Sequence, residues 1–233
     1  MLKFLFLFLI CSVCVAQNNC IKVVYNAEVI DIAELTKANN PVESLFKAAK
    51  ENASALRFDL SIISGCSLFK ARNMLSTSAN GDVITTSMPF LDYSGEVYRC
   101  DKEVLRQILI LGSKTYLKKI DAQDWNITAE TKLIDTYVCY KATSIRVVQG
   151  IDKVFHQPIT AWFCPNLPFS FGPNGYGGLP GLILELQVHT SFYKAMSIET
   201  IENCEVKPRN FETIKVVTET ELNQMLDKFM EEE

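Results

Sequence analysis

Four polar side chains in the second half of the sequence are of the types that hydrolases use: Asp124, Ser170, Glu185 and His189. Glu185 and His189 lie four residues apart on one face of a predicted strand, which separates them by about 13 Å at ~3.3 Å per residue. That distance is too large for direct proton transfer between them. Ser170 lacks the strand-to-helix turn that exposes the nucleophile of serine hydrolases. We therefore expect a protein that is not an enzyme, with a hydrolase as an alternative.

Metal and nucleic-acid chemistry have even less support in the sequence. The two histidines, His156 and His189, are far apart, and no C-x-x-C pair occurs after residue 16. Zinc sites usually combine closely spaced ligands, so we expect no metal and no cofactor. The formal net charge is −4 and the chain has no basic stripe. Phosphate recognition needs clustered Lys and Arg, so a nucleic-acid partner is not expected.

The first residues have the composition of a secretory signal peptide. One lysine precedes an apolar run, and small residues at Cys14 and Ala16 precede Gln17. The run is too short to span a bilayer comfortably, and such a pattern is typical of a cleaved leader. We expect a signal peptide over residues 1–16 and a single domain over 17–233, without a transmembrane segment. The protein is then exported to the periplasm, the outer membrane or the cell exterior.

The cysteines indicate disulfide chemistry in such an exported chain. Of eight cysteines, two lie in the leader and an even set remains: Cys20, Cys66, Cys100, Cys139, Cys164 and Cys204. An even set in an oxidising compartment predicts three disulfides. The sequence alone leaves the fifteen possible pairings open.

Short apolar stretches of alternating character predict that most of the chain is β. The candidates are "CIKVVYNAEVI", "ALRFDLSII", "EVYRC", "VLRQILIL", "TYLKKI", "WNITAETKLI", "TYVCYKATSIRVV", "ITAWFC" and "LILELQVH". The second carries Leu56, Phe58, Leu60 and Ile62 on one side, "VLRQILIL" also fits a helical face, and Asn80-Gly81 predicts a hairpin turn. Several short strands in succession favour one antiparallel, meander-like sheet. The fold class expected is mainly β (α+β).

Two helices are expected beside the sheet. "NNPVESLFKAAKENA" places Val42, Leu45, Phe46 and Ala49 on one face after Asn40 and Pro41. In "TETELNQMLDKFMEEE", Thr218 and Glu221 form a capping-box pattern. Its apolar stripe comprises Leu222, Met225, Leu226, Phe229 and Met230. We expect this stripe to pack on the sheet, with a partner-binding helix as the alternative.

The stretch "GPNGYGGLPGL" is the densest cluster of glycine and proline in the chain. A phosphate-binding loop would lead into a helix, but here an alternating run follows, with Leu182, Leu184, Leu186 and Val188 on one face. Glycine permits positive φ and proline fixes φ, so the cluster predicts a rigid, sharply turned start to a strand. Whether the turn only directs the chain or also forms a binding edge stays open.

Gly178-Leu179-Pro180-Gly181-Leu182-Ile183 resembles the motif that names the GLPGLI family, exported proteins of the Bacteroidetes without an established role. "DWNITAETKLI", "YVCYKAT" and "ITAWFCPNLPFSFGPNGYGGLPGLILEL" are similar to the same family's pattern, over about positions 124–190. Cys164 departs from it, since members more often have threonine there. The resemblance implies an envelope protein with a curved antiparallel sheet, similar to the half-barrels of periplasmic lipoprotein carriers.

The predicted register brings two cysteines together. If "TYVCYKATSIRVV" pairs with "ITAWFC" across a turn near Gly150 and Ile151, Cys139 lies opposite about Cys164. We therefore expect a Cys139–Cys164 disulfide, or at least neighbouring sulfur atoms.

A half-barrel would have an apolar concave face, for which Leu182, Leu184, Leu186 and Phe58 are candidates. Candidates for a binding loop or platform are Trp162, Phe169, Phe171, Tyr176, Gly178, Leu179, Pro180 and Gly181. We expect a non-enzymatic binding or chaperone-type protein for an apolar or peptidic partner. An accessory subunit docking to an outer-membrane transport complex is the alternative. Equally, the same side chains could simply fill an ordinary core.

Overall fold

The computed structural model describes residues 19–32, 35, 42–72, 86–110, 112–121, 123–150, 153–202, 204, 206 and 214–231. The predicted leader over 1–16, the Asn40 cap and the Asn80-Gly81 turn lie outside the described residues. No helix within the described part is long and apolar enough to cross a membrane.

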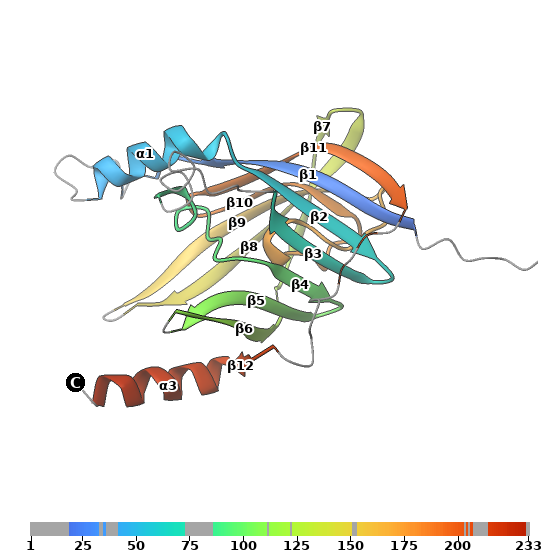
Figure 1. Cartoon of the computed structure of the whole chain (residues 1–233). Coiled ribbons are helices and arrows are strands. Elements are labelled where there is room, and N and C mark those ends of the chain that lie inside the picture. Colours follow the sequence, from blue (N-terminus) through green and yellow to red (C-terminus); the bar gives the residue numbers. More distant parts are fainter. Residues whose placement is uncertain are drawn as a thin grey trace, which may run out of the picture.

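One curved, open sheet of 12 strands dominates the fold (Figure 1). The strands are β1 (Asn19–Val29), β2 (Arg57–Ile63), β3 (Cys66–Ala71), β4 (Val97–Cys100), β5 (Glu103–Ile110), β6 (Ser113–Ile120), β7 (Asn126–Ile134), β8 (Tyr137–Gln149), β9 (Val154–Cys164), β10 (Leu182–Val188), β11 (Ser191–Glu202) and β12 (Val216–Thr218). Their order across the sheet is β12-β6-β5-β4-β3-β2-β1-β11-β10-β9-β8-β7. Only β12 pairs in parallel, with β6. The mainly β prediction is confirmed, including β5, whose pattern also fitted a helix.

Alternation along the strands gives the sheet an apolar face that is covered by other parts of the chain. The predicted set Leu56, Phe58, Leu60 and Ile62 is buried in the largest core cluster. Phe58 stacks on Phe69, with ring centroids 5.2 Å apart, and Tyr193 meets Phe58 edge-on at 5.4 Å. Offset and edge-to-face contacts are the favoured geometries for aromatic pairs.

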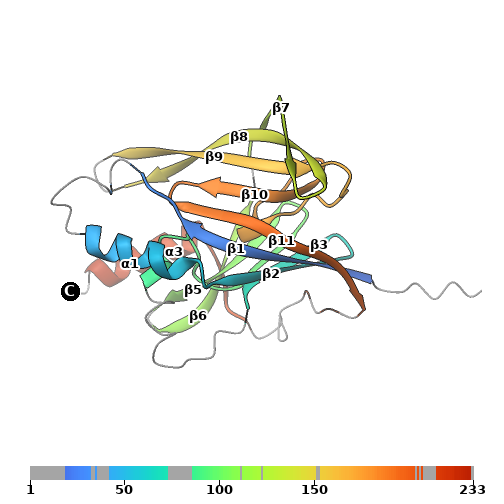
Figure 2. The same ribbon diagram turned by 90° about the horizontal axis from the view of Figure 1, so that it is seen from above.

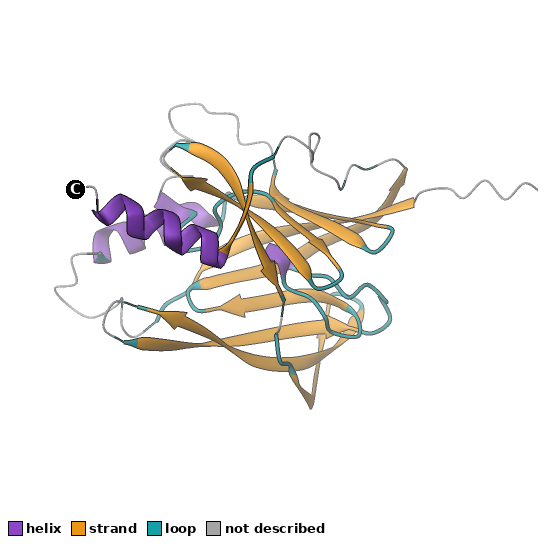
Figure 3. Ribbon diagram, turned by 90° about the horizontal axis from the view of Figure 1, so that it is seen from below, coloured by secondary structure: helices purple, strands orange, loops and turns teal. Residues whose placement is uncertain are grey.

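Segment 165–181 and residues 86–96 cover this face, since Phe171 and Leu91 are buried in the largest core cluster. The short helix that Figure 3 draws within the curve of the sheet belongs to segment 165–181. This helix is η1 (Pro173–Gly175), a single 3-10 turn. The Tyr25 hydroxyl donates to the Ile183 carbonyl at 2.6 Å, and the Tyr193 hydroxyl donates to the Leu91 carbonyl at 2.7 Å. Irregular backbone that enters a core needs such partners, because an unpaired buried carbonyl is costly.

Helix α1 (Glu43–Ala53) packs beside β1 through Phe46, Ala49 and Ala53. Leu45, which was expected on the buried face, is 56% exposed. The periodicity of this helix allows a face centred on either side of Phe46, and tertiary packing selects the side that contains Ala53.

Helix α3 (Glu219–Glu231) lies at the same end of the sheet as α1 (Figure 2). Its predicted capping box is confirmed: the Glu221 backbone N–H donates to the Thr218 hydroxyl, and the Thr218 N–H donates to the Glu221 carboxylate. The prediction that its stripe packs on the sheet is wrong for Met225 and Phe229, which are 36% and 47% exposed. The helix contacts β6 and β12 only sparsely, because it runs on from the very short edge strand β12.

Two disulfides form, Cys20–Cys204 and Cys66–Cys100, with Cα atoms 5.8 and 4.2 Å apart. The third expected bridge is absent, since Cys139 and Cys164 are buried free thiols. The expected β8–β9 register is confirmed, but its last pair is Tyr140–Phe163. The same register, continued by one pair, places Cys139 opposite Cys164, and the two side chains lie within hydrogen-bonding reach. The expected neighbouring sulfur atoms are therefore confirmed, although no disulfide forms.

Strand β10 starts directly after the glycine-proline cluster, as expected, but its predicted single apolar face is wrong. A bulge between Ile183 and Glu185 interrupts the pairing with β9. Leu182 and Leu184 belong to the largest core cluster, whereas Ile183, Leu186 and Val188 belong to a second cluster with residues of β8 and β9. A bulge shifts side chains from one face to the other without changing the sequence pattern.

The two free thiols should be unreactive in the folded protein. Burial, with Cys164 and Glu185 nearby, raises the pKa of Cys139 to about 12. A raised pKa keeps the thiol protonated at pH 8, and the thiolate is the reactive form. We expect iodoacetamide at pH 8 to leave both cysteines unmodified until denaturant is added, as measured by peptide mass spectrometry. Rapid labelling of the native protein, or a Cys139–Cys164 peptide in a non-reduced digest, would contradict this.

Gly181 should tolerate no side chain. A Cβ there would lie 2.2 Å from the Cys164 carbonyl oxygen, which is backbone and cannot move aside. We expect Gly181→Ala to lower the free energy of unfolding by about 3 kcal/mol in urea titrations. Gly112→Ala is the control: its φ is also positive but it faces open space, so only about 1 kcal/mol should be lost. Equal losses would show that crowding at Gly181 is unimportant.

Candidate functional site

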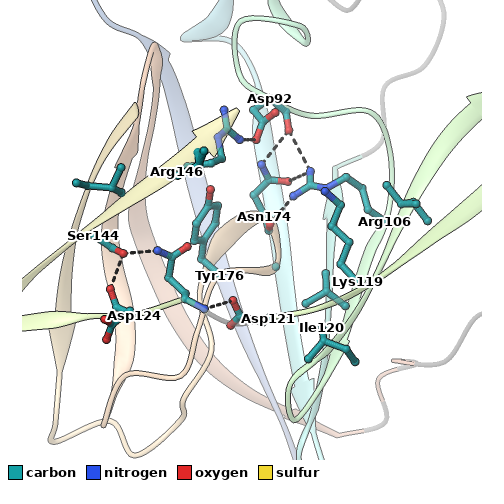
Figure 4. A pocket seen from close by; sticks show the side chains of 16 residues that line it. Asp92, Arg106, Lys119, Ile120, Asp121, Asp124, Ser144, Arg146, Asn174 and Tyr176 are labelled. Atoms are coloured by element: carbon teal, nitrogen blue, oxygen red, sulfur yellow. Dashed lines mark hydrogen bonds and ion pairs between the residues drawn. The ribbon is translucent and has the colours of Figure 1, made fainter. Parts of the chain in front are cut away.

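A cleft of about 490 Å³ opens between β5 and β6 on one wall and β8 on the other. Segment 165–181 supplies its floor at Asn174, Gly175 and Tyr176, and residues 121–124 border it (Figure 4). The close-up shows the side chains of Arg106 and Arg146 entering from opposite walls toward Asp92 and Asn174. The cleft therefore lies where β5 and β6 from one side of the sheet approach β8 from the other, above the segment that fills the interior.

Asn174 fixes the floor of the cleft. It is buried, and it adopts a left-handed backbone conformation, φ 54°. Its amide nitrogen donates to the Asp92 carbonyl at 2.9 Å, while its side-chain oxygen accepts from Arg106 at 2.8 Å. Arg106 also donates to the Asn174 carbonyl at 3.0 Å. Asparagine tolerates this conformation better than most residues. One residue therefore adopts the backbone conformation of the turn and also forms the hydrogen bonds to Asp92 and Arg106.

Arg146 anchors the opposite wall. Its guanidinium forms an ion pair with Asp92 and donates to the Gln157 side chain at 2.7 Å. Burial alone would lower the pKa of Arg146, but Asp92 and Tyr176 outweigh burial, so that its pKa is raised and its charge is secure. Burial raises the pKa of Tyr176 despite the nearby Arg146, so this phenol stays protonated near neutral pH.

Other polar groups of the cleft bond to one another. The Ser144 hydroxyl donates to the Asp124 carbonyl at 2.5 Å and accepts from Gln123. Among the described residues, no cluster of three His, Cys, Asp or Glu side chains could hold a metal ion. The polar groups of the cleft are thus held in place by hydrogen bonds and ion pairs within the protein.

The wall at β8 ends in a strand edge with which no strand of the described residues pairs. β7 pairs with β8 only as far as Thr143. Gly150 donates to the Lys153 carbonyl at 2.9 Å, and hydrogen-bonded pairs alternate in an antiparallel ladder. The backbone groups of Ile145, Val147 and Gln149 therefore point away from β9. Ile145 and Val147 are also 59% and 62% exposed.

The candidate residues of the glycine-proline loop separate into different environments. Tyr176 lines the cleft, whereas Phe169, Phe171 and Gly178 line a second recess. Leu179 is buried and Pro180 is exposed. Trp162 lies elsewhere, half-buried, with the Lys132 ammonium 4.3 Å above its ring. The loop thus borders two hollows rather than forming one binding edge.

The expected apolar binding face is filled. Leu182, Leu184, Leu186 and Phe58 are all fully buried against neighbouring side chains. The alternative that these residues form an ordinary core is the one observed. Segment 165–181, residues 86–96 and helix α1 all cover them, since Phe171, Leu91 and Phe46 are buried in the largest core cluster and Leu179 in the second.

The four hydrolase candidates are dispersed. Glu185 is buried between Lys132 and Lys194, while His189 occupies the β10–β11 turn with φ 51°. Asp124 lines the cleft and Ser170 the second recess. None of these arrangements pairs a nucleophile with a base.

The residues that build the cleft were not singled out from the sequence. They are Asp92, Arg106, Arg146 and Asn174. A usable signal existed in two of them, because an arginine at an alternate position within an apolar strand, as in "VLRQILIL" and "SIRVV", requires a buried partner.

Comparison with known proteins supports the fold and gives no activity. A family profile described as "Protein of unknown function (Porph_ging)" matches residues 151–185, which include β9 and the glycine-proline loop. No curated protein matches. The structures of PNGF-II in space groups C2 and P21 are similar, each with TM-score 0.53 and 17% identity, over 90% and 89% of this chain. The match covers 33% of the PNGF-II chain, so this chain spans about a third of that protein.

Asn174 offers a test of how the floor is held. Asn174→Ala leaves Arg106 and the Asp92 carbonyl without their partner, costing about 2 kcal/mol, and places a Cβ without polar support in the left-handed region for about 1 kcal/mol more. Asn174→Gly is the matched control, since it removes only the hydrogen bonds. We expect urea unfolding to rank wild type, Asn174→Gly and Asn174→Ala in decreasing stability. Full stability of Asn174→Gly would mean that the side-chain hydrogen bonds contribute nothing.

Proposed function

We propose that this chain is an exported, non-enzymatic binding protein that takes an extended peptidic partner in the cleft between β6 and β8. The observation that carries the proposal is the free edge of β8 along the cleft wall. Ile145, Val147 and Gln149 offer unpaired backbone groups there, and a peptide that adds a strand to an exposed edge satisfies such groups directly.

The side chains of the cleft suit a peptide better than a lipid. Arg106, Arg146 and Lys119 face Asp121 and Asp124 across the floor, so both signs of charge are present. Ile120 and Ile145 supply exposed apolar surface at the rim. A peptide presents backbone amides and alternating polar and apolar side chains, which can add hydrogen bonds to the polar side chains of the cleft, whereas an alkyl chain offers none.

Export and membership of the GLPGLI family are parts of the same proposal. Disulfides persist in oxidising compartments, and the two bonds formed here support an exported location. The Porph_ging match includes the Gly178–Ile183 phrase, which supports the family assignment without covering most of the chain.

A single amide tests strand addition. Val147→Pro deletes an outward-facing N–H, which an edge strand tolerates, whereas Val147→Thr keeps it. Heptapeptides selected from a random phage-displayed library should bind the wild type and Val147→Thr equally, and Val147→Pro at least tenfold more weakly, by fluorescence polarisation. On peptide binding, hydrogen exchange should slow at the amides of residues 145, 147 and 149.

Two results would refute the proposal. One is a library that yields no peptide enriched over a blank surface. The other is a set of peptides that bind Val147→Pro as tightly as the wild type, which would place them away from the strand edge.

Docking to a larger assembly is a second candidate, favoured by the exposed apolar side chains of Met225 and Phe229 on α3. The double substitution Met225→Ser with Phe229→Ser separates the two functions. It should leave peptide binding in the cleft unchanged while abolishing association through the helix.

A further inference from the structure

A second recess, of about 540 Å³, borders the glycine-proline loop at the end of the sheet where β1 begins. The turns that join β2 to β3 and β4 to β5 form its rim, and residues 168–171 with Gly178 form its roof. Arg99 of β4 lies in its wall. No residue of this recess contributes to the peptide cleft described above.

Arg99 is the unusual group of this recess, because it is only 3% exposed and incompletely paired. Its Nη1 makes both recorded hydrogen bonds, to the Asp121 carboxylate and to the Gly175 carbonyl. Its Nε has no hydrogen-bond partner among the described residues. A buried N–H without a partner is unfavourable and is normally explained by a missing acceptor.

Glycine backbone covers this side of the guanidinium. A Cβ on Gly177 would lie 3.0 Å from the Arg99 Nε, and one on Gly178 would lie 3.7 Å from its Nη2. Gly178 itself is exposed and lines the recess. Gly177 therefore lies against the guanidinium near Nε, and Gly178, which lines the recess, lies beside Nη2, so neither residue places a side chain between Arg99 and the recess.

The Nε–Nη2 edge of an arginine presents two parallel donors that match the two oxygens of a carboxylate. Lys102 at the rim adds a positive charge, while Asp101 beside it disfavours a ligand with two negative charges. Ile21, Ile62 and Phe169 give the recess apolar walls. We infer that this recess binds a monocarboxylate with an apolar body, its carboxylate on Arg99.

The rim is held in place before any ligand arrives. Cys66 and Cys100 are directly opposite each other on β3 and β4, and their disulfide fastens the two rim turns together. The Cys20–Cys204 disulfide fixes the start of β1 beside the same recess. A prearranged site loses less conformational entropy on binding.

Titration calorimetry of the full chain with decanoate and decan-1-ol tests the inference, since the two differ only in the carboxylate. Decanoate should bind at least tenfold more tightly. Acetyl-Ala-Leu with a free or an amidated C-terminus is the second pair, and it distinguishes a fatty acid from a peptide C-terminus as the source of the carboxylate. Equal binding within both pairs, or no binding of any probe, would overturn the inference.

Two variants locate the site. Arg99→Lys keeps a charge for Asp121 but lacks the fork, and should weaken decanoate binding at least tenfold. Because Arg99→Lys also disturbs the hydrogen bonds to Asp121 and Gly175, Lys102→Glu provides an independent test at an exposed position, with at least fivefold weaker binding expected. Lys47→Glu on α1 makes the same change of charge far from the recess and should have no effect. If Lys102→Glu and Lys47→Glu bind decanoate alike, the carboxylate does not lie in this recess.

Discussion

A single sheet that bends over on itself must have its inner apolar face covered by its own chain. Here segment 165–181 and residues 86–96 cover it, and their side chains Leu179, Phe171 and Leu91 are buried against the strands of the sheet. The segment fits only because glycine stands where it meets other backbone, at Gly177 against the Ser170 carbonyl and at Gly181 against the Cys164 carbonyl. The curvature of the sheet and the glycine-proline cluster thus depend on each other.

Buried irregular backbone also has to be satisfied, and arginines perform this task. Arg106 and Arg99 donate to the carbonyls of Asn174 and Gly175, one from β5 and one from β4. Arg106 also lines the cleft and Arg99 also lines the recess, and the segment fills neither of these hollows. The cleft and the recess are therefore consequences of how the interior is closed, which explains why both border the same loop.

Local patterns predicted most of this fold and little of its sites. Alternation located nine of the described strands, and Thr218 with Glu221 located the start of α3, because these features depend on near neighbours; β3, β11 and β12 were not predicted. The bulge at β10 escaped prediction since "LILELQV" alternates whether or not Leu184 is displaced. The cleft escaped because Asp92, Arg106, Arg146 and Asn174 come from four segments whose meeting depends on the order of the whole sheet. Cys20 and Cys204 likewise pair only because β1 lies beside β11.

The Cys20–Cys204 bond spans a sequence separation of 184 residues and so joins the first strand to the end of β11. It turns almost the whole sheet into a covalent ring. Such a ring cannot close on a nascent chain until Cys204 has emerged, so its closure follows the synthesis of β1 to β11, whereas β12 comes later in the sequence. Once closed, a single backbone cut within the ring would leave the two pieces tethered, and the protein would survive nicking that would release a fragment from an unlinked chain.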